Sequence, residues 1–564
     1  MLFTLARYYL KLLAAFFFQE VETVGRHLTP STGPVILCGN HSNQFVDPVL
    51  IISQCKRQPS FLMAASSMKK KVVGSLARLF HVIPVKRPQD YVTKGTGTIT
   101  YDDDLKRIIG TGTKFVTEVH PGDALKCEKV MITVKSVEND TVVVPMGPAI
   151  GIKDMQFKIM PKIDQHDIYE AVQTELRKGG CIGIFPEGGS HDRPNLLPLK
   201  AGVCLMALGA MSRYNITVTI QCVGLNYYQG HRFRSKAVVN FGVPYAIPRE
   251  LASLYLRDRK RAVEILLKQI ENRLGEVWVT APTYDELSHV FMARRVYKPD
   301  HLRENPALDM EMNIKFAKGY KELKEKYSDL PDFKNLVQIV EAYSNNLKKI
   351  GLQDYQLRLS NFSKVKMIAY TLITLIRILG GLTISLPGWV IAGLMGAILN
   401  YIAEKERKKA LMSSSVKLNA SDTVASTKIV YGMVLMFLFT LFLQIVAFIY
   451  TYYLYGSFWT SLEYLAITGV AWPIYMYLAI ILSDRAFSSF GRLYSRALSI
   501  CSPREIENLK SQRAQLKEHV VKLVNEHGPK IFPGLQPGDL FKEKANDLDD
   551  MLNGAFNLLN EIGL

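Results

Sequence analysis

The sequence predicts an α/β domain that carries a β-rich insertion, followed by an α-helical membrane region of about four spans in two hairpins. Three observations support this prediction. Short apolar runs that end in glycine and polar residues alternate with helix-like segments in the first part of the chain. Residues 92–160 change to β-type runs separated by turns. Two long apolar stretches then follow residue 364, and 564 residues exceed what one hydrophobic core usually supports.

The α/β domain is expected in two parts, at residues 31–91 and 161–295. Residues 34–39 and 180–185 are short apolar runs bounded by turn-forming residues, a pattern typical of buried strands. Before them, residues 1–30 contain an amphipathic helix without a cleavage site for a signal peptide. This helix could lie on a bilayer surface or pack as an ordinary core helix, and the sequence fits both.

The insertion at residues 92–160 contains three β-type runs, at 115–119, 130–134 and 141–144. Turn sequences of the Pro-Gly-Asp and Glu-Asn-Asp type separate them. We therefore expect a small β-rich unit. A lid, a partner site and a neutral surface insertion all remain open as its role.

Two apolar stretches predict the membrane region. Beyond its basic start, the stretch at residues 364–403 has Arg377 as its one charge, and Pro387 near its middle predicts a hairpin of two short spans. A second hairpin is expected at 429–484, with a break at Gly456. Alternatively, the first stretch is re-entrant or interfacial and never crosses, because an arginine is costly in the middle of a bilayer.

The segments that flank the hairpins are basic, whereas the expected turns carry no Lys or Arg. The positive-inside rule therefore places the loop 404–428, the tail 485–564 and the α/β domain in the cytosol. Residues 296–363 and the tail show helical periodicity with mixed charge, and helices are expected in the tail at 503–526 and 539–562. Solvated helices or a short coiled pair are the plainer interpretation of the tail, and a specific docking role is the alternative.

The net charge of +18 would suit nucleic acid, an anionic bilayer or a phosphate-bearing substrate. Zinc-finger spacing, RNA-binding aromatic signatures and continuous basic helices are missing from the sequence, so a membrane and an anionic substrate are favoured over nucleic acid. The seven cysteines are scattered, mostly in apolar segments, and predict buried thiols in a reducing compartment. No metal site is expected.

Polar side chains follow the strand predicted at residues 34–39. His41 and Asp47 lie between this strand and the next helix, where open α/β sheets bind ligands. A neutral imidazole can take a proton from an alcohol, and a carboxylate can hold its tautomer and stabilise the imidazolium that forms. Taken alone, the pair is weak evidence, because a helix-capping aspartate beside an incidental histidine is the more common arrangement.

Two further blocks supply groups suited to a phosphorylated substrate. Lys86 and Arg87 end a predicted strand, where Arg87 can bind a phosphate bidentately and Lys86 can act as a point charge; a solvated strand end is the alternative. A glycine pair follows the strand at 180–185 and lets backbone amides approach a ligand. Glu187 in the same block can hydrogen-bond a substrate hydroxyl or a positioning residue.

Four blocks in this order resemble the motifs of the glycerolipid acyltransferase superfamily. They are Asn40-His41 with Asp47-Pro48, residues 83–87, residues 185–188 with Lys200-Ala201-Gly202, and the apolar strand 218–223. The resemblance is strongest to the endoplasmic-reticulum glycerol-3-phosphate/dihydroxyacetone-phosphate acyltransferases of the fungal type, which have a similar His-x-Asn-Gln-Phe-Val-Asp-Pro block, an insertion between the second and third motifs, and a C-terminal membrane part. The motif resemblance covers residues 34–245.

This resemblance implies acyl-CoA-dependent acylation of the sn-1 hydroxyl of glycerol-3-phosphate to lysophosphatidic acid, the first step of glycerolipid synthesis, with dihydroxyacetone phosphate as a further acceptor. It implies that His41 is the general base, that Asp47 orients it and that Arg87 grips the phosphate. Other residues implied to bind substrate are Asn43, Lys86, Glu187, Gly188, Gly189, Ser190, Arg193 and Lys200. Acyl-CoA is then a co-substrate, and no bound cofactor is expected.

Two departures from the superfamily pattern bear on the site. Five residues rather than four separate His41 from Asp47, which leaves open whether their side chains touch. Gly189-Ser190-His191 stands where the common block has Thr-Arg-Ser, so a cation is lost that Arg193 would replace.

Two other functions stay open, acylation of lysophosphatidic acid and a catalytically silent membrane scaffold or lipid tether. The expected location is the endoplasmic-reticulum membrane, as a multi-pass protein with its catalytic domain and tail in the cytosol. The expected partners are acyl-CoA, the phosphorylated acceptor and the lipid bilayer, and a homo-oligomer remains open.

Overall fold

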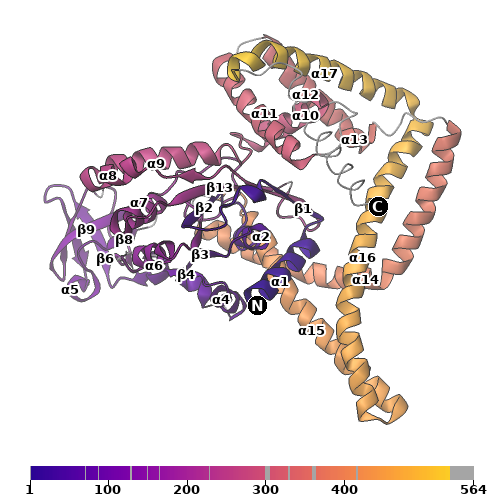
Figure 1. Cartoon of the computed structure of the whole chain (residues 1–564). Helices are drawn as coiled ribbons and strands as arrows, with labels where there is room; N and C mark the ends of the chain where they lie inside the picture. Colours follow the sequence, from indigo (N-terminus) through magenta and orange to yellow (C-terminus); the bar gives the residue numbers. More distant parts are fainter. Residues whose placement is uncertain are drawn as a thin grey trace.

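An eight-stranded sheet forms the centre of the first part of the chain in the computed structural model (Figure 1). The structure describes residues 2–69, 71–86, 88–127, 130–148, 150–163, 166–227, 229–298, 305–327, 331–357, 364–414 and 417–533. The order of the sheet is β1-β14-β13-β2-β12-β3-β4, and β15 pairs with β13. Its strands are β1 (Glu20–Val24), β2 (Val35–Gly39), β3 (Pro59–Ala64), β4 (Ile83–Val85), β12 (Cys181–Ile184), β13 (Thr219–Tyr227), β14 (Lys236–Phe241) and β15 (Tyr245–Ala246).

The middle of the sheet is parallel, because β13, β2, β12, β3 and β4 all run in the same direction. Helices cover both of its faces, which explains why β2 is apolar at every position. Successive side chains of a strand point to opposite faces. Val35 and Leu37 pack on the side of α1 (Leu2–Phe17) and α2 (Val46–Gln54). Ile36 and Cys38 pack on the opposite side, whose helices are α6 (His166–Arg177), α7 (Gly202–Tyr214), α8 (Arg249–Arg257) and α9 (Arg259–Leu274).

Helix α1 combines a core face with an exposed apolar face. Leu10 and Ala14 are buried in the core cluster beside α2. Leu5 and Leu12, on the other side of the same helix, expose 69% and 64% of their area although they are leucines. One face of this helix therefore packs as part of an ordinary core helix, as expected. Contact of its other face with a bilayer stays a prediction.

The insertion folds as a separate seven-stranded antiparallel sheet in the order β5-β11-β8-β9-β10-β7-β6. Its strands are β5 (Thr93–Lys94), β6 (Thr98–Asp102), β7 (Arg107–Thr111), β8 (Ala124–Cys127), β9 (Val130–Asn139), β10 (Val142–Pro145) and β11 (Lys158–Met160). The predicted α/β domain with a β-rich insertion is thus confirmed.

The β-type run expected at 115–119 was wrong, because it forms the short helix α5 (Phe115–Glu118). Phe115 and Val119 are both buried, whereas Val116 is 58% exposed. Apolar residues four positions apart share one face of a helical turn, and this spacing outweighed the high β-propensity of the run.

A second group of helices follows the α/β domain. It contains α10 (Tyr284–Tyr297), α11 (Pro306–Tyr327), α12 (Pro331–Ile350), α13 (Asp354–Leu357) and, from the tail, α17 (Pro503–Ile531). Leu516 and Val520 of α17 share one apolar cluster with Leu336 and Val340 of α12. The tail helix is therefore docked on this group rather than solvated on all sides, as Figure 1 shows. The tail helix expected at 539–562 lies outside the described residues.

Three helices of the described residues are long and apolar enough to cross a membrane. They are α14 (Lys364–Ser413), α15 (Asp422–Tyr455) and α16 (Phe458–Cys501). The second expected hairpin is present as α15 and α16, joined at Gly456. The first expected hairpin was wrong, because α14 continues through Pro387 as one helix. The described residues therefore contain three candidate spans, where about four were expected.

A tyrosine of α16 explains why Pro387 does not end α14. Proline blocks regular helix hydrogen bonding around itself. The N–H of Gly388, which would normally bond to the carbonyl of Ile384, donates instead to the hydroxyl of Tyr475 at 3.1 Å, and this hydroxyl donates to the Ile384 carbonyl at 3.1 Å. Insertion of a side chain into the helix ladder is a known cause of a bend without a break. Sequence alone does not reveal this partner, because it lies 87 positions beyond Gly388.

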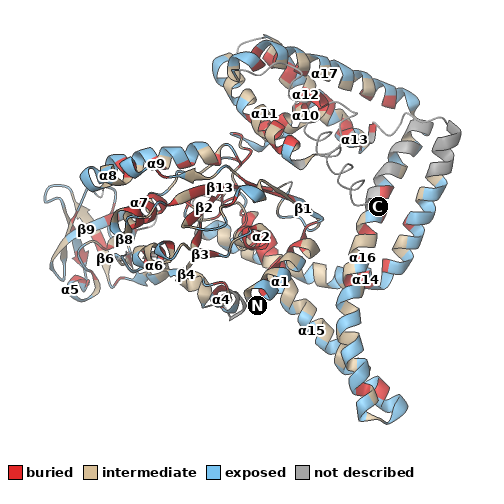
Figure 2. Cartoon of the chain, viewed as in Figure 1, coloured by how far each residue is buried: buried red, intermediate tan, exposed pale blue. Residues whose placement is uncertain are grey.

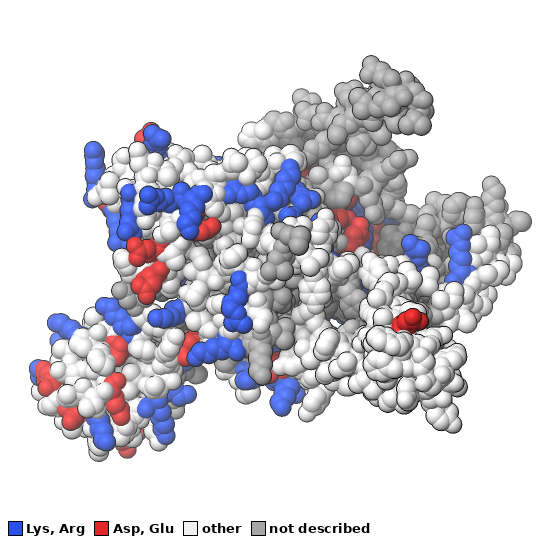
Figure 3. Space-filling view, turned by 60° about the horizontal axis from the view of Figure 1, so that its bottom comes forward, with Lys and Arg blue, Asp and Glu red and all other residues white. Residues whose placement is uncertain are grey.

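The apolar helices expose much of their surface. Figure 2 shows α15 and α16 largely exposed or intermediate, while buried residues concentrate in the sheet and in the helical group. Phe437 and Trp459, for example, are 67% and 73% exposed. In Figure 3 the charged side chains gather over the α/β domain and the insertion, and the apolar hairpin is mostly uncharged. Exposed apolar area on this scale indicates association with a membrane.

Candidate active site

His41 and Asp47 are in direct contact despite the five residues between them. His41 follows the end of β2, and Asp47 lies in the first turn of α2. The Nδ1 atom of His41 is 2.8 Å from Oδ2 of Asp47, and the Asp47 side chain is fully buried. The carboxylate therefore accepts the Nδ1 hydrogen and leaves the lone pair on Nε2, which is the tautomer that a general base requires.

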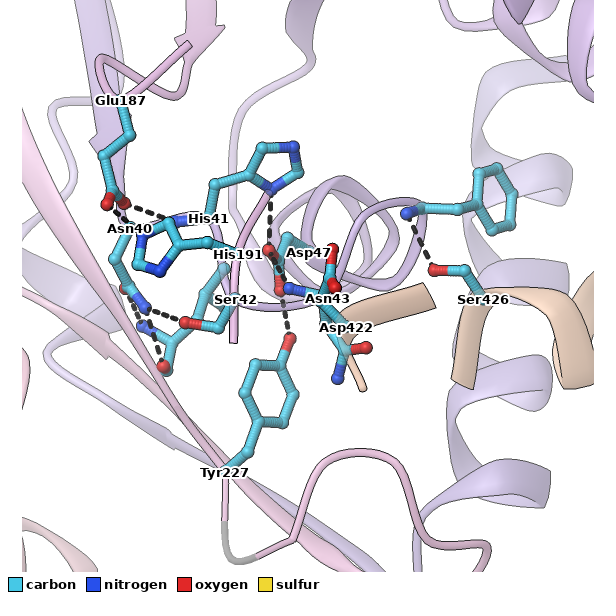
Figure 4. Close-up of polar contacts among 12 residues, drawn as sticks. Asn40, His41, Ser42, Asn43, Asp47, Glu187, His191, Tyr227, Asp422 and Ser426 are labelled. Atoms are coloured by element: carbon cyan, nitrogen blue, oxygen red, sulfur yellow. Dashed lines mark hydrogen bonds and ion pairs between the residues drawn. The ribbon is translucent and has the colours of Figure 1, made fainter. Parts of the chain in front are cut away.

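Two further donors hold Asp47 in place (Figure 4). The backbone N–H of Asn43 donates to Oδ2 at 2.8 Å, and the hydroxyl of Tyr227, at the end of β13, donates to Oδ1. Burial of the tyrosine hydroxyl, together with the charge of Asp47 and the hydrogen bond to it, raises the pKa of Tyr227 well above its ordinary value. Tyr227 is therefore a permanent donor, and the three donors suit the carboxylate form of Asp47.

The imidazole of His41 lies flat on the ring of Phe185, which follows β12. The ring centroids are 4.1 Å apart and the planes differ by 8°. The His41 side chain keeps 17% of its area exposed, and its Nε2 atom makes no hydrogen bond to the part of the chain that the structure describes. One nitrogen of the imidazole is thus fixed by the protein and the other is available to a ligand, as the predicted role of general base requires.

The third block holds the backbone of His41. Glu187 Oε1 accepts the N–H of His41 at 2.8 Å, and the N–H of His191 donates to the His41 carbonyl at 3.0 Å. The other oxygen of Glu187 accepts from the His191 ring and from the N–H of Leu197 at 3.0 Å. The Nδ1 atom of His191 accepts the N–H of Arg193 at 3.2 Å, so its Nε2 carries the hydrogen that Glu187 receives.

Several predicted substrate-binding residues therefore bind the protein itself. The Glu187 side chain has no exposed area and uses both oxygens on the loops around His41. Asn43 is 2% exposed, and its Nδ2 donates to the Gly230 carbonyl at 3.3 Å. Of the two roles considered for Glu187, this geometry favours the contact with a positioning residue.

Other predicted residues of the third block lie nearer the surface. Gly188 has a φ of +78°, and a Cβ there would lie 2.5 Å from Nζ of Lys200, so the lysine side chain crosses directly over this glycine. Gly188 and Lys200 are exposed, Gly189 and Arg193 are half-buried, and Ser190 is buried. A cationic amine over exposed backbone is an arrangement that can bind an anionic group.

Lys86 is exposed directly after β4. Because β2, β12, β3 and β4 are adjacent and parallel, Lys86 lies at the same edge of the sheet as His41 and Glu187. Arg87, the predicted phosphate-binding residue, lies outside the described residues, and its role stays a prediction.

Two family models match the chain. The acyltransferase model matches residues 20–134, and the model of the C-terminal domain of glycerol-3-phosphate acyltransferase 2 matches residues 289–532. Glycerol-3-phosphate O-acyltransferase 1 of Saccharomyces cerevisiae is 34% identical over 96% of this chain and 73% of its own length. The chain belongs to the glycerol-3-phosphate O-acyltransferase family.

Two further similarities extend this comparison. Glycerol-3-phosphate O-acyltransferase 2 of Saccharomyces cerevisiae is 28% identical over 94% of this chain and 77% of its own length. A solved structure, the 1-acyl-sn-glycerophosphate acyltransferase of Thermotoga maritima, is 13% identical with a TM-score of 0.25, covering 47% of this chain and 79% of its own.

Sequence reasoning missed two contributors to this acyltransferase site. Tyr227 gave no local signal, because it stands at the end of a long strand and its hydrogen-bond partner, Asp47, lies 180 positions earlier. His191 stood in the third block, but its departure from the superfamily pattern drew attention to the lost cation rather than to a new hydrogen bond. Among the described residues, no group of three or more His, Cys, Asp or Glu side chains is arranged to hold a metal ion.

Proposed function

We propose that this acyltransferase transfers a fatty acyl group from acyl-CoA to the sn-1 hydroxyl of glycerol-3-phosphate, giving lysophosphatidic acid. The observation that supports this proposal most directly is the contact of His41 with Asp47, in a chain that is 34% identical to a glycerol-3-phosphate O-acyltransferase. Dihydroxyacetone phosphate is a second acceptor in this proposal, since it has a phosphate and a primary hydroxyl and is similar in size to glycerol-3-phosphate.

His41 acts as the general base. Its Nε2 takes the proton of the sn-1 hydroxyl, and the oxygen attacks the thioester carbonyl of acyl-CoA. The carbon–sulfur bond breaks as the tetrahedral intermediate collapses, and the proton passes from the imidazolium to the CoA thiolate. Asp47 stabilises the imidazolium through its bond to Nδ1. Backbone amides of the first or third block stabilise the oxyanion.

The acceptor phosphate is proposed to bind the cations at the same edge of the sheet. Arg87 provides a bidentate contact, and Lys86 and Lys200 add positive charge. A bound phosphate holds the three-carbon acceptor against His41 and favours it over water.

We further propose that the protein is a multi-pass protein of the endoplasmic-reticulum membrane with its catalytic domain in the cytosol. The mostly uncharged surface of α15 and α16 and the basic residues that flank them support insertion from the side of the catalytic domain. In this proposal α15 and α16 cross the bilayer and α14 does not, which is the alternative left open for its stretch. The 92–160 insertion and the C-terminal tail then both face the cytosol, so tags placed in them should both be digested by protease added to sealed microsomes.

Purified protein tested with a series of acyl-CoA donors should release free CoA with glycerol-3-phosphate. Lysophosphatidic acid as acceptor should give little release; a preference for it would replace the proposed reaction with the next acylation. Substitution His41→Ala should lower kcat by about 100- to 10,000-fold, the usual contribution of a general base, with little change in KM.

A matched control is His120→Ala, because His120 is 77% exposed and precedes β8 in the separate sheet of the insertion. It should retain normal turnover. Arg87→Ala should mainly raise the KM for the phosphorylated acceptor, with Arg107→Ala, an exposed arginine of the insertion, as its control. Full turnover by the His41 variant would exclude His41 as the base, whereas no release of CoA by the native protein with any acceptor would leave the scaffold hypothesis standing.

A further inference from the structure

The segment that leads into helix α15 is held by the catalytic domain. Ser421 occupies the N-cap position but makes no side-chain capping bond to its helix. The carboxylate of Asp192 instead binds the backbone of Ser421 and of the residues just before it. Its Oδ1 accepts the N–H of Leu418 at 2.8 Å, and its Oδ2 accepts the N–H groups of Asn419 at 2.7 Å and Ser421 at 3.1 Å. The Ser421 hydroxyl lies 3.2 Å from the same oxygen.

This arrangement binds one negative charge at the positive end of a long helix. Asp192 is 5% exposed. Burial alone would raise the pKa of Asp192, but the backbone N–H donors of Leu418, Ser421 and Asn419 outweigh it, so the pKa lies below its ordinary value. A buried carboxylate with several backbone donors is a strong anchor, because hydrogen bonds to a charged acceptor are stronger than those to a neutral one.

A second contact joins the same helix to the first catalytic block. The N–H of Phe45 donates to the hydroxyl of Ser426 in α15 at 2.9 Å (Figure 4). Phe45 is the N-cap of α2 and stands two positions before Asp47, and its N–H belongs to the donors that a helix start leaves unpaired. Ser426 of α15 thus satisfies a donor at the start of α2, while Asp192 of the catalytic domain holds the segment before α15.

Both contacts are made by residues that lie next to the segments holding His41. His191, the residue before Asp192, donates its N–H to the His41 carbonyl at 3.0 Å. Phe45 lies in the short segment between His41 and Asp47, the two residues whose side chains must meet. The first turns of α15 thus hold the loop of the third block on one side and the loop of the first block on the other.

We propose that Asp192 is a positioning residue that anchors α15 to the catalytic domain, so that His41 and Asp47 are correctly placed only while this membrane helix is docked. The inference rests on the proposed acyl transfer for its kinetic effect, but the docking itself is independent of which acceptor is used. A displacement of the loop by about 1 Å can lower turnover on the order of 100-fold.

Asp192→Asn tests this proposal in the full-length protein, since asparagine keeps the shape but turns a donor group toward the backbone N–H groups. We expect kcat to fall by about 10- to 100-fold, with less than about a threefold change in the KM for acyl-CoA. Hydrogen exchange should become faster in peptides covering 417–427 and also in those covering 40–47. Ser426→Ala is the milder variant and should speed exchange in both segments to a smaller extent.

Asp123→Asn is the matched control. Asp123 is also 5% exposed and accepts two backbone bonds, from His120 at 2.8 Å and Lys162 at 2.7 Å, but it lies in the insertion. Its variant should speed exchange near these residues and leave kcat unchanged. Faster exchange at 417–427 alone, with normal kcat, would overturn the proposal. If the native protein lacked the assumed turnover, exchange at 40–47 would still decide whether α15 holds the catalytic loop.

Discussion

The hydroxyl of Tyr227 offers a sharp test of how the catalytic pair is held. Substitution Tyr227→Phe removes the donor to Oδ1 of Asp47 and leaves the aromatic ring in place. The carboxylate keeps its bonds to His41 Nδ1 and to the Asn43 N–H, both on Oδ2. With Oδ1 unpartnered, the carboxylate can rotate, and the alignment of Oδ2 with the imidazole is no longer fixed from both sides.

The size of the effect follows from the type of bond. A hydrogen bond to a charged group contributes about 1.5–3 kcal/mol when one partner is removed, and Asp47 is fully buried, so water does not replace the lost donor. We expect the free energy of unfolding to fall by about this amount. If the same energy is lost from the transition state, kcat falls by about 10- to 150-fold.

Tyr343→Phe is a matched control in the same chain. The hydroxyl of Tyr343 donates at 2.7 Å to Asp354, which is also fully buried, but the two residues lie in the helical group that contains α12 and α17. Both variants should lose similar stability in denaturant titrations. Only Tyr227→Phe should lose turnover in the CoA-release assay.

Equal stability losses with equal, unchanged kcat values would refute the reasoning. That result would mean that Asp47 keeps its orientation through Oδ2 alone. A change confined to the KM for the acceptor would also contradict it, because Tyr227 would then act on substrate binding rather than on the base.

Three further predictions concern other parts of the molecule. Tyr475→Phe removes the hydroxyl that bridges Ile384 and Gly388 in α14, so the free energy of unfolding in detergent should fall by about 1–3 kcal/mol. Thermal scanning measures this change, and an unchanged Tm would mean that water replaces the hydroxyl. Of the cysteines, Cys501 is exposed and the other six are buried, so mild alkylation followed by mass mapping should label Cys501 alone, and labelling of a strand cysteine in folded protein would contradict this. The pKa of Asp192 is lowered in the fold, so the contribution of this carboxylate to docking is complete above its ordinary pKa of 3.8 and is lost only as the pH falls through the lowered pKa. Hydrogen exchange in residues 417–427, corrected for intrinsic rates, should therefore show no loss of docking between pH 7 and about pH 5.

The sequence was sufficient for the sheet that carries the site. Residues 34–39 and 180–185 are apolar at nearly every position, and the structure makes them the buried parallel strands β2 and β12, which pair with each other. Because both strands end at the same edge, the polar residues that follow them had to meet. This is why the polar residues that follow both strands belong to one site.

Local pattern was insufficient where a distant partner decides the conformation. Pro387 predicts a break, and the chain has none because Tyr475 supplies the missing hydrogen bonds. The run at 115–119 has β-type residues, but burial of Phe115 and Val119 on one side selects a helical turn. In both cases a tertiary contact outweighed a preference of the backbone.

The candidate site shows the same division at the level of side chains. His41 and Asp47 can be found from sequence because they stand close together in the chain. Tyr227, His191 and Ser426 cannot, because each acts through a hydrogen bond to a residue that lies between 150 and 381 positions away in the chain. A base and its carboxylate are chemistry that a short motif can encode, whereas holding them still requires partners from every layer of the fold, including a helix of the membrane region. Replacing one such partner should therefore change turnover without changing any residue that touches substrate.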